Sequence, residues 1–437
     1  MPRKGPRSLA YRSWPGRTLK GSDSGAWRPL LEGSLRERAL EAVGLIADAL
    51  PDPPDPKDDG ALDWSFAGGS AGLAVLCTYL SRSLDEPYEG TAEGFLDHAG
   101  RSIEAEPTGH SLYEGFTGVA WATEHVHRQL SPEGEDPTEE VDSVLAETLS
   151  RSPWEGPYDL IGGLTGIGIY ALERFPRGDS VQCLAAVIER LAETAEQNHA
   201  GITWVTDSRW FGPSYRVNHP ERFRDVGVAH GVAGVIALLG RAIARDVAAD
   251  VARPLLEGAV DWLLGQKLPG GSGAFPAWVD PDVAPSPTRS AWCYGDPGVS
   301  AALLVAGRAA GEPSWEREAL DLARMAALRP VEETGVVDAG LCHGAAGLAH
   351  LFNRMHRSTG DPVLADAARS WFQRTLDMRD PAGRYGGFRA GNADDDGNRV
   401  WEDDPGFLTG AAGIALALLA AATPVEPEWD RVMAVSG

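Results

Sequence analysis

The stretch Arg289-Ser-Ala-Trp-Cys-Tyr-Gly-Asp-Pro-Gly298 places a cysteine directly before a turn that is bounded by two glycines. A second stretch, Leu341-Cys-His-Gly-Ala-Ala-Gly347, repeats this arrangement later in the chain. In both, two residues separate the glycines, and an apolar run rich in small residues follows. Glycine permits the close backbone approach that the start of a helix in a crowded interior requires. The two stretches therefore predict the same local structure, a polar turn that opens a buried helix.

The same G-x-x-G pattern occurs seven times along the chain. Each copy precedes an apolar helical run, such as residues 235–243, and follows a more polar helical run, such as residues 181–197. The interval between successive copies lies between 46 and 68 residues, which is the size of a structural repeat. The copies are Gly69/Gly72, Gly115/Gly118, Gly163/Gly166, Gly231/Gly234, Gly295/Gly298, Gly344/Gly347 and Gly410/Gly413.

These repeats predict an all-α fold. Each repeat supplies one apolar helix that packs inward and one amphipathic helix that covers it. We expect seven such helical hairpins with G-x-x-G turns to close into a double-layered α/α toroid, or barrel, with every turn facing one mouth. Residues that directly precede the turns then converge, although they are far apart in the sequence. An α-solenoid of the HEAT type is the alternative, but its repeats are usually more uniform in length.

The toroid is expected to span residues 31–422. Six basic residues and no acidic residue precede Asp23, among prolines and glycines, so residues 1–30 predict a flexible basic arm. Residues 423–437 are expected to form a C-terminal tail.

Composition restricts the classes of partner and compartment. The chain has 437 residues and a net charge of −24, which argues against binding to nucleic acid or to an anionic membrane surface. Four cysteines are too few for a disulfide framework and favour a reducing cytoplasm. No apolar run approaches the roughly 18 residues of a transmembrane helix.

Cys293, Cys342 and His343 form the set of ligands that Zn²⁺ prefers. Three protein ligands leave a fourth position open, as in catalytic zinc sites. Neighbouring side chains diverge on a helix or strand, so Cys342 and His343 can share a metal only from an irregular turn, which Gly344 supplies. We expect one zinc per chain. The alternative is two buried thiols and a structural histidine.

Four further residues occupy comparable places. His230 and Tyr294 directly precede the first glycine of their turns, Asp159 lies shortly before another turn, and Arg289 opens the first stretch quoted above. The histidine is a candidate proton donor, with a fourth metal ligand or a hydrogen-bonded core histidine as alternatives. The aspartate is a candidate for catalysis or for helix capping. The arginine is an active-site or a surface residue, and the tyrosine has a chemical role or forms a hydrophobic wall.

The turns at Trp292–Gly298, Cys342–Gly347 and Ala229–Gly234 resemble those of the LanC-type lanthipeptide cyclases, the family of the nisin cyclase. The resemblance covers roughly residues 35–420. It implies an α/α toroid with a central zinc, in agreement with the fold predicted from the repeats. It also implies that the ligands of this zinc are Cys293, Cys342 and His343.

By the same resemblance, His230, Asp159, Arg289 and Tyr294 match the other active-site positions of the family. The expected roles are protonation of the α-carbon by His230, stabilisation of an enolate by Arg289, and orientation or charging of a neighbour by Asp159. His219 lies near the place of a further family histidine, and we leave it outside the expected site.

The implied function is that of a zinc-dependent lanthionine synthetase, or cyclase. It adds peptide cysteine thiols to dehydroalanine or dehydrobutyrine in a dehydrated precursor peptide and so forms thioether rings. The expected partners are a precursor with a leader and a separate dehydratase, because seven turns leave no room for one in this chain. An export transporter is a further candidate partner, and nucleic acid is not expected.

Three other functions are considered. One is a LanC-like protein that adds glutathione, and another is a non-catalytic scaffold of a peptide-modifying complex. The third is a toroidal glycosidase or prenyl-transfer enzyme. A glycosidase needs a pair of carboxylates across a cleft, and no such pair stands out at the turns.

Overall fold

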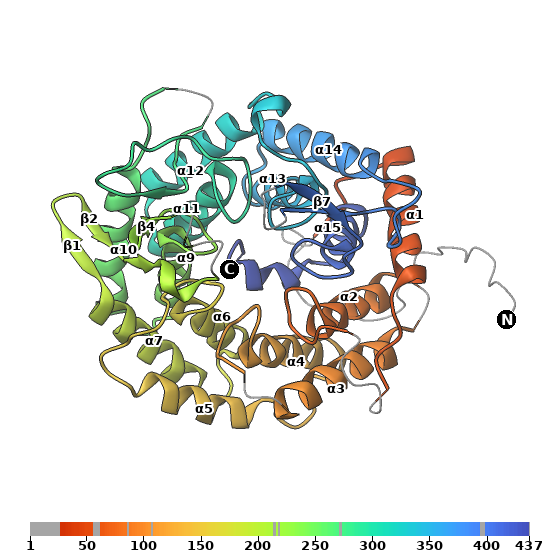
Figure 1. Ribbon diagram of the computed structural model, residues 1–437, viewed down its shortest axis with the longest axis horizontal. Helices are drawn as coiled ribbons and strands as arrows, with labels where there is room; N and C mark the ends of the chain where they lie inside the picture. The colour runs from red at the N-terminus through yellow and green to blue at the C-terminus, as the bar shows by residue number, and fades with distance from the viewer. Residues whose placement is uncertain are drawn as a thin grey trace, which may run out of the picture. The chain divides into compact units, whose positions relative to one another are not determined.

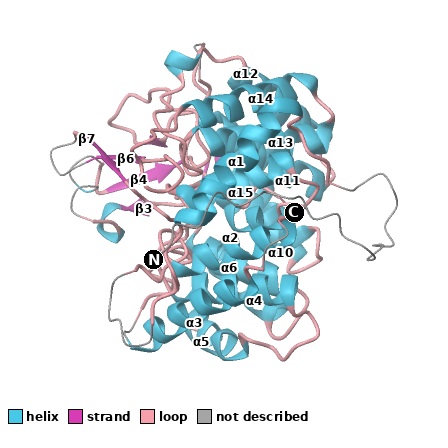
Figure 2. Ribbon diagram, turned by 90° about the vertical axis from the view of Figure 1, so that its right-hand side faces the viewer, coloured by secondary structure: helices cyan, strands magenta, loops and turns pink. Residues whose placement is uncertain are grey.

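The computed structural model describes residues 27–55, 62–84, 87–105, 108–212, 216, 219–270, 273–393 and 398–436. The expected basic arm lies outside these residues except for residues 27–30. The described part is mostly helical (Figure 2). It contains fourteen α-helices, and its strands are at most four residues long. Within it, no helix combines the length and the apolar character needed to cross a membrane.

The described residues divide into two compact units. The first comprises the described residues within Met1–Ser102, Val126–Pro132 and Val337–Glu428, and the second comprises those within Ile103–His125, Glu133–Val336 and Trp429–Gly437. Each unit has its own inner and outer layer of helices.

The first unit has an inner layer of apolar helices covered by amphipathic ones. All twelve residues of α15 are buried, whereas α14 buries one stripe only. Helix α15 packs on α2, α13 and α1, and α13 packs on α14 (Figure 1). The helices are α1 (Gly33–Ala49), α2 (Ser70–Ser83), most of α3 (Glu89–Ala105), α13 (Ala345–Thr359), α14 (Pro362–Asp377) and α15 (Ala411–Ala422). Strands β6 (Ala390–Ala393) and β7 (Arg399–Glu402) form an antiparallel hairpin in which Ala390 pairs with Glu402.

The second unit repeats this arrangement. Helices α6 (Leu164–Arg174), α9 (Val232–Ile243) and α11 (Asp296–Ala310) form its inner layer. They pack on α7 (Ser180–Thr194), α10 (Ala249–Leu264) and α12 (Pro313–Ala327), respectively, which lie outside them (Figure 1). Eleven of the twelve residues of α9 are buried. The unit also contains most of α4 (Phe116–Leu130), α5 (Glu139–Leu149) and the short 3₁₀ helices η1 (Ser208–Trp210), η2 (Val331–Glu333) and η3 (Glu428–Met433).

Short strands occur between α7 and α11. Strand β1 (Glu196–Asn198) pairs with β2 (Gly201–Thr203), and β4 (Arg222–Asp225) pairs with both β3 (Thr206–Asp207) and β5 (Trp278–Val279). The helix predicted over residues 181–197 is wrong at its C-terminal end. It stops at Thr194, and Asn198 instead turns the chain by accepting a hydrogen bond from the Ala200 N–H at 2.8 Å.

In six of the seven G-x-x-G turns both glycines lie where a side chain has no room, and in the remaining turn Gly115 does. A Cβ on Gly295 would lie 2.0 Å from the carbonyl oxygen of Arg289, and its φ of +104° also disfavours any other residue. A Cβ on Gly347 would lie 1.8 Å from the carbonyl oxygen of Leu341. In both cases the turn folds back on backbone six residues earlier. The repeated glycines are thus explained by this close return of the chain.

Backbone hydrogen bonds join neighbouring turns within each unit. The carbonyl two residues before the first glycine of one turn accepts an N–H from another turn, so the turns are held in register without side chains. In the second unit these bonds are Leu112 N to Ile161 O (3.0 Å), Leu160 N to Ala229 O (3.1 Å) and Val228 N to Cys293 O (2.9 Å). In the first unit they are Cys342 N to Leu408 O (2.8 Å) and Phe407 N to Ala67 O (2.8 Å).

Candidate functional site

Cys293 lies in the turn before α11 and is buried. Its carbonyl oxygen accepts hydrogen bonds from the N–H groups of Val228 and Ala229, at 2.9 and 3.3 Å. A guanidinium nitrogen of Arg289 lies 4.0 Å from its sulfur, so the arginine lies beside the thiol although the residue as a whole is exposed. The turn therefore holds a thiol and a cation at one place.

Cys342 and His343 lie in the turn before α13. Asp338 shapes this turn, because its carboxylate accepts hydrogen bonds from the N–H groups of Gly340 (3.1 Å) and Gly391 (3.0 Å). The backbone is irregular here, so adjacent side chains are not forced to opposite sides. The imidazole Nδ1 of His343 is buried and has no hydrogen-bond partner among the described residues. A buried polar atom without a partner is costly unless something else satisfies it.

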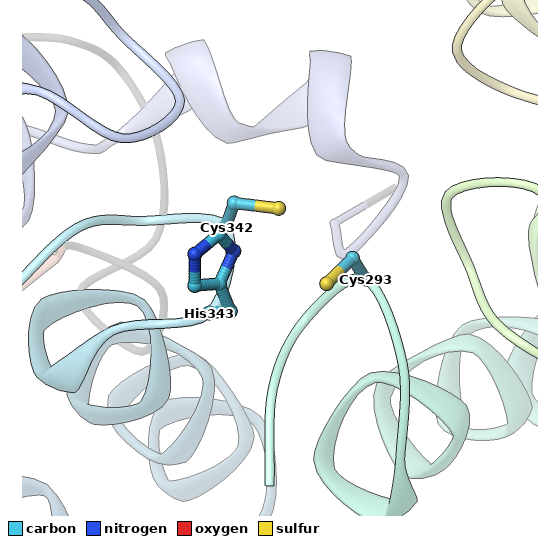
Figure 3. A group of neighbouring side chains, drawn as sticks. All are labelled: Cys293, Cys342 and His343. Atoms are coloured by element: carbon cyan, nitrogen blue, oxygen red, sulfur yellow. The ribbon is translucent and has the colours of Figure 1, made fainter. Parts of the chain in front are cut away.

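The structure brings the three expected metal ligands together (Figure 3). One ligand atom each of Cys293, Cys342 and His343 lies within 4.8 Å of the other two. Zinc binds sulfur at about 2.3 Å and nitrogen at about 2.0 Å, so neighbouring ligand atoms of one zinc lie roughly 3.3–3.8 Å apart. The set of donors, their spacing and the unsatisfied imidazole nitrogen all fit a zinc ion.

His230 and Asp159, which both lie in the second unit, form a hydrogen-bonded pair. Nδ1 of His230 lies 2.5 Å from Oδ2 of Asp159, while Oδ1 of Asp159 accepts the N–H of Gly162 at 2.8 Å. The aspartate thus stabilises its own turn, as a capping residue would, and also holds the histidine. Burial lowers the pKa of His230, but the Asp159 carboxylate outweighs this effect, and the net pKa is raised. With Nδ1 engaged, Nε2 is the nitrogen available for proton transfer.

Asp225 is a residue that the sequence analysis did not identify. It is fully buried, and its carboxylate accepts hydrogen bonds from the Gly227 N–H (2.9 Å) and the Tyr294 hydroxyl (3.0 Å). Burial raises the pKa of Asp225 to about 7. The Tyr294 ring lies beside that of His230, with centroids 6.4 Å apart. Tyr294 is therefore held by a polar anchor and at the same time borders the histidine.

Asp225 belongs to a pattern that can be read from the sequence, but this pattern indicates a role in turn structure and not in a functional site. An aspartate stands six residues before the first glycine in four turns, and in each it accepts the N–H two residues later. The four are Asp63, Asp225, Asp338 and Asp404. Only the structure shows that one of them also binds the tyrosine next to a candidate metal ligand.

His219 packs against two aromatic side chains. Its ring stacks on Phe223, with centroids 5.3 Å apart, and contacts Trp278 at 5.6 Å. The structure places it in an aromatic cluster on strands β4 and β5.

Comparisons with known proteins give a consistent result. The family model described as "Lanthionine synthetase C-like protein" matches residues 60–434. Glutathione S-transferase LANCL1 of Danio rerio is 24% identical over 349 residues, which cover 75% of this chain and 77% of the relative. Nisin biosynthesis protein NisC of Lactococcus lactis subsp. lactis is 26% identical over 274 residues, which cover 56% of this chain and 62% of that protein.

A solved structure of nisin cyclase shares the fold. It superposes with a TM-score of 0.70 at 18% identity and covers 92% of this chain and 98% of its own. The match confirms the fold class predicted from the repeats, an all-α protein with the α/α-toroid fold.

Proposed function

Because the chain belongs to the lanthionine synthetase C-like family, we propose that it is a zinc-dependent cyclase that forms thioether rings in a dehydrated peptide. The observation that carries the proposal is the cluster of Cys293, Cys342 and His343. Two thiols and an imidazole are the donors expected for a thiol-activating zinc. The likeness to nisin cyclase supports cyclase chemistry in general.

The three clustered residues would hold the zinc through two sulfurs and one nitrogen. The chemistry that zinc supplies there is a lowered pKa for a further bound thiol, so that a thiolate is available near neutral pH. Three protein ligands leave room for that thiol. His230 is engaged with Asp159 and so acts as a proton donor in this proposal, not as a fourth ligand.

The reaction adds a thiol across a carbon–carbon double bond and needs no oxidant. The cysteine S–H bond breaks, a bond forms between sulfur and the β-carbon of the dehydro residue, and the π-electron pair moves toward the adjacent carbonyl. The resulting enolate then takes up a proton at the α-carbon. One proton leaves the thiol and one enters the product, so the two sides balance.

This chain has residues for both charged steps. The guanidinium of Arg289, beside the Cys293 sulfur, stabilises the enolate oxygen as it gains charge. Nε2 of protonated His230 donates the proton to the α-carbon, and Asp159 keeps that proton available by favouring the imidazolium form. Tyr294, anchored on Asp225, limits the space beside the histidine.

The proposed partners follow from the substrate. Dehydro residues have to be made by a separate dehydratase, and the precursor carries a leader that binds outside the site. An export transporter is a further proposed partner. We place the enzyme in the cytoplasm, alone or on a membrane-bound modification complex, because thiolate ligands persist in a reducing compartment.

The test uses a peptide that contains one dehydroalanine and one cysteine. Zinc-loaded protein is expected to remove the free thiol, measured by alkylation and mass spectrometry, without changing the mass of the peptide. His230→Ala is expected to be strongly impaired, whereas the matched variant His219→Ala retains activity. No loss of thiol with zinc-loaded protein contradicts the proposed reaction, and equal rates for the two variants contradict the proton donor.

A second candidate function is addition of glutathione to dehydrated peptides. It is favoured by the similarity to LANCL1, which covers more of this chain than the similarity to NisC does. A dehydroalanine peptide without cysteine, incubated with reduced glutathione, separates the two functions. A mass gain of one glutathione supports the second, and an unchanged peptide supports the cyclase.

A further inference from the structure

Most of the residues that follow Glu428, the first residue of η3, are buried. We call residues 429–436 the C-terminal segment. Trp429, Val432 and Ala434 are fully buried, and Met433 is almost so. The sequence analysis placed this stretch in a tail, beyond the domain. The burial of these side chains shows that the segment packs against other parts of the protein.

One end of the C-terminal segment contacts the inner helices. Arg241, near the end of α9, donates a hydrogen bond to the carbonyl oxygen of Arg431 at 3.1 Å. Arg431 in turn lies 3.6 Å from a carboxylate oxygen of Glu173 in α6. Asp430 accepts a hydrogen bond from the Ser436 hydroxyl at 2.5 Å, which closes the segment on itself.

The middle of the C-terminal segment contacts two of the G-x-x-G turns. The indole N–H of Trp292 donates to the carbonyl oxygen of Met433 at 2.9 Å, and the Tyr113 hydroxyl donates to that of Val432 at 3.1 Å. The two rings also contact each other, with centroids 6.0 Å apart. Adjacent carbonyls of the segment are therefore held by a pair of packed aromatic side chains.

Trp292 directly precedes Cys293, so this contact reaches the candidate metal ligand. On its other side, the Cys293 carbonyl is held by Val228 and Ala229. The backbone around the cysteine is thus fixed by a neighbouring turn on one side and by the C-terminal segment on the other. A sulfur that ligates a metal needs such support, because second-layer contacts set the orientation of ligands.

We infer that Trp292 is a positioning residue for the metal site, and that it acts by fastening the Cys293 turn to the C-terminal segment. The inference rests on the proposed zinc centre and extends it. The indole N–H has no part in the chemistry itself. Its role is to fix the turn so that the cysteine sulfur stays in reach of the other two ligands.

The test compares Trp292→Phe with Trp204→Phe in the full chain. Trp204 is a matched control, because it too is buried and donates its indole N–H to a carbonyl, that of Leu191, at 2.9 Å. Both variants lose one buried hydrogen bond and keep an aromatic ring. Zn²⁺ affinity is measured by competition with a chromogenic chelator, and the absorption spectrum of the Co²⁺-substituted protein reports the ligand geometry.

Trp292→Phe is expected to weaken zinc binding about tenfold and to alter the Co²⁺ spectrum, while Trp204→Phe changes neither. Equal zinc affinity in the two variants overturns the inference, while zinc binding and cyclisation by the wild type leave the proposed function standing. If Trp292→Phe does not fold, Tyr113→Phe loosens the same segment, and it is expected to weaken zinc binding in the same direction. An unchanged affinity in Tyr113→Phe then refutes the role of the segment.

Discussion

The pair formed by His230 and Asp159 allows a sharp test of proton donation. Asp159→Asn keeps the Oδ1 atom that accepts the Gly162 N–H, so the turn before α6 is retained. It replaces the oxygen that lies 2.5 Å from Nδ1 of His230 by an amide nitrogen. The variant therefore removes the charge and the acceptor from the histidine with little change in shape.

The size of the effect follows from the lost interaction. Both side chains are largely buried, at 19% and 5% exposed, so solvent screens the pair only weakly. A hydrogen bond to a charged group contributes about 1.5–3 kcal/mol. If this energy supports the imidazolium in the transition state, its loss lowers the rate roughly 10- to 150-fold.

The pH dependence of the cyclisation rate shows in which direction Asp159 shifts the pKa of His230. Asp159 raises the pKa of His230 against the opposing effect of burial, so the protonated donor persists to higher pH than in a free histidine. Without the carboxylate the pKa of His230 falls, and the donor form is lost at lower pH. The cyclisation rate, measured as loss of free thiol from pH 6 to 9, is expected to decline earlier on the alkaline side in Asp159→Asn.

Zinc content serves as the control, because Asp159 is not one of the clustered ligands and the variant is expected to bind zinc like the wild type. A rate within twofold of the wild type at every pH, with the alkaline decline unmoved, would refute proton donation by His230.

Three further outcomes are expected. In chemical denaturation, the wild type is expected to lose stability relative to Asp225→Asn as the pH rises from about 4 to 7. The pKa of Asp225 is about 7 in the folded protein and roughly 3.9 in the unfolded chain, so ionisation in this range favours unfolding of the wild type, whereas asparagine does not ionise. A parallel pH dependence of the two proteins contradicts this. Burial raises the pKa of the Cys77 and Cys183 thiols to about 12, so both are expected to resist Ellman's reagent at pH 8 until the protein unfolds, and rapid modification of either in the native state contradicts their burial. Arg174→Met removes the cation shared by three carboxylates and is expected to lower the free energy of unfolding by roughly 3–5 kcal/mol, whereas an unchanged midpoint in denaturant refutes a structural role for this network.

The repeats made most of the fold predictable from the sequence. The seven glycine pairs mark backbone that returns on itself, and a side chain at Gly295 or Gly347 would collide with a carbonyl. Apolar periodicity predicted the helix that ends at Ile243, although this helix begins at Val232 and not at residue 235. The end of α7 at Thr194 was not predicted. It depends on the pairing of β1 with β2 and on an Asx turn at Asn198, and a helical pattern in the sequence does not reveal these contacts.

The candidate site was predictable to a similar extent. Cys293 and Cys342 each lie two residues before the first glycine of their turns, and His343 lies one residue before it, so their meeting followed from the repeat. The anchoring of Tyr294 on Asp225 did not, because the same aspartate position serves turn geometry elsewhere. The contact between Trp292 and Met433 joins residues far apart in the sequence, and no local pattern encodes it.

The central claim is that Cys293, Cys342 and His343 hold one catalytic zinc. Its most direct test is the zinc content of purified, zinc-loaded wild type, Cys293→Ala and the control Cys77→Ala, which removes a buried thiol elsewhere. We expect roughly one zinc per chain in the wild type and the control, and none in Cys293→Ala, with all three proteins folded. Wild type that retains no zinc, or Cys293→Ala that retains as much as the control, contradicts the account.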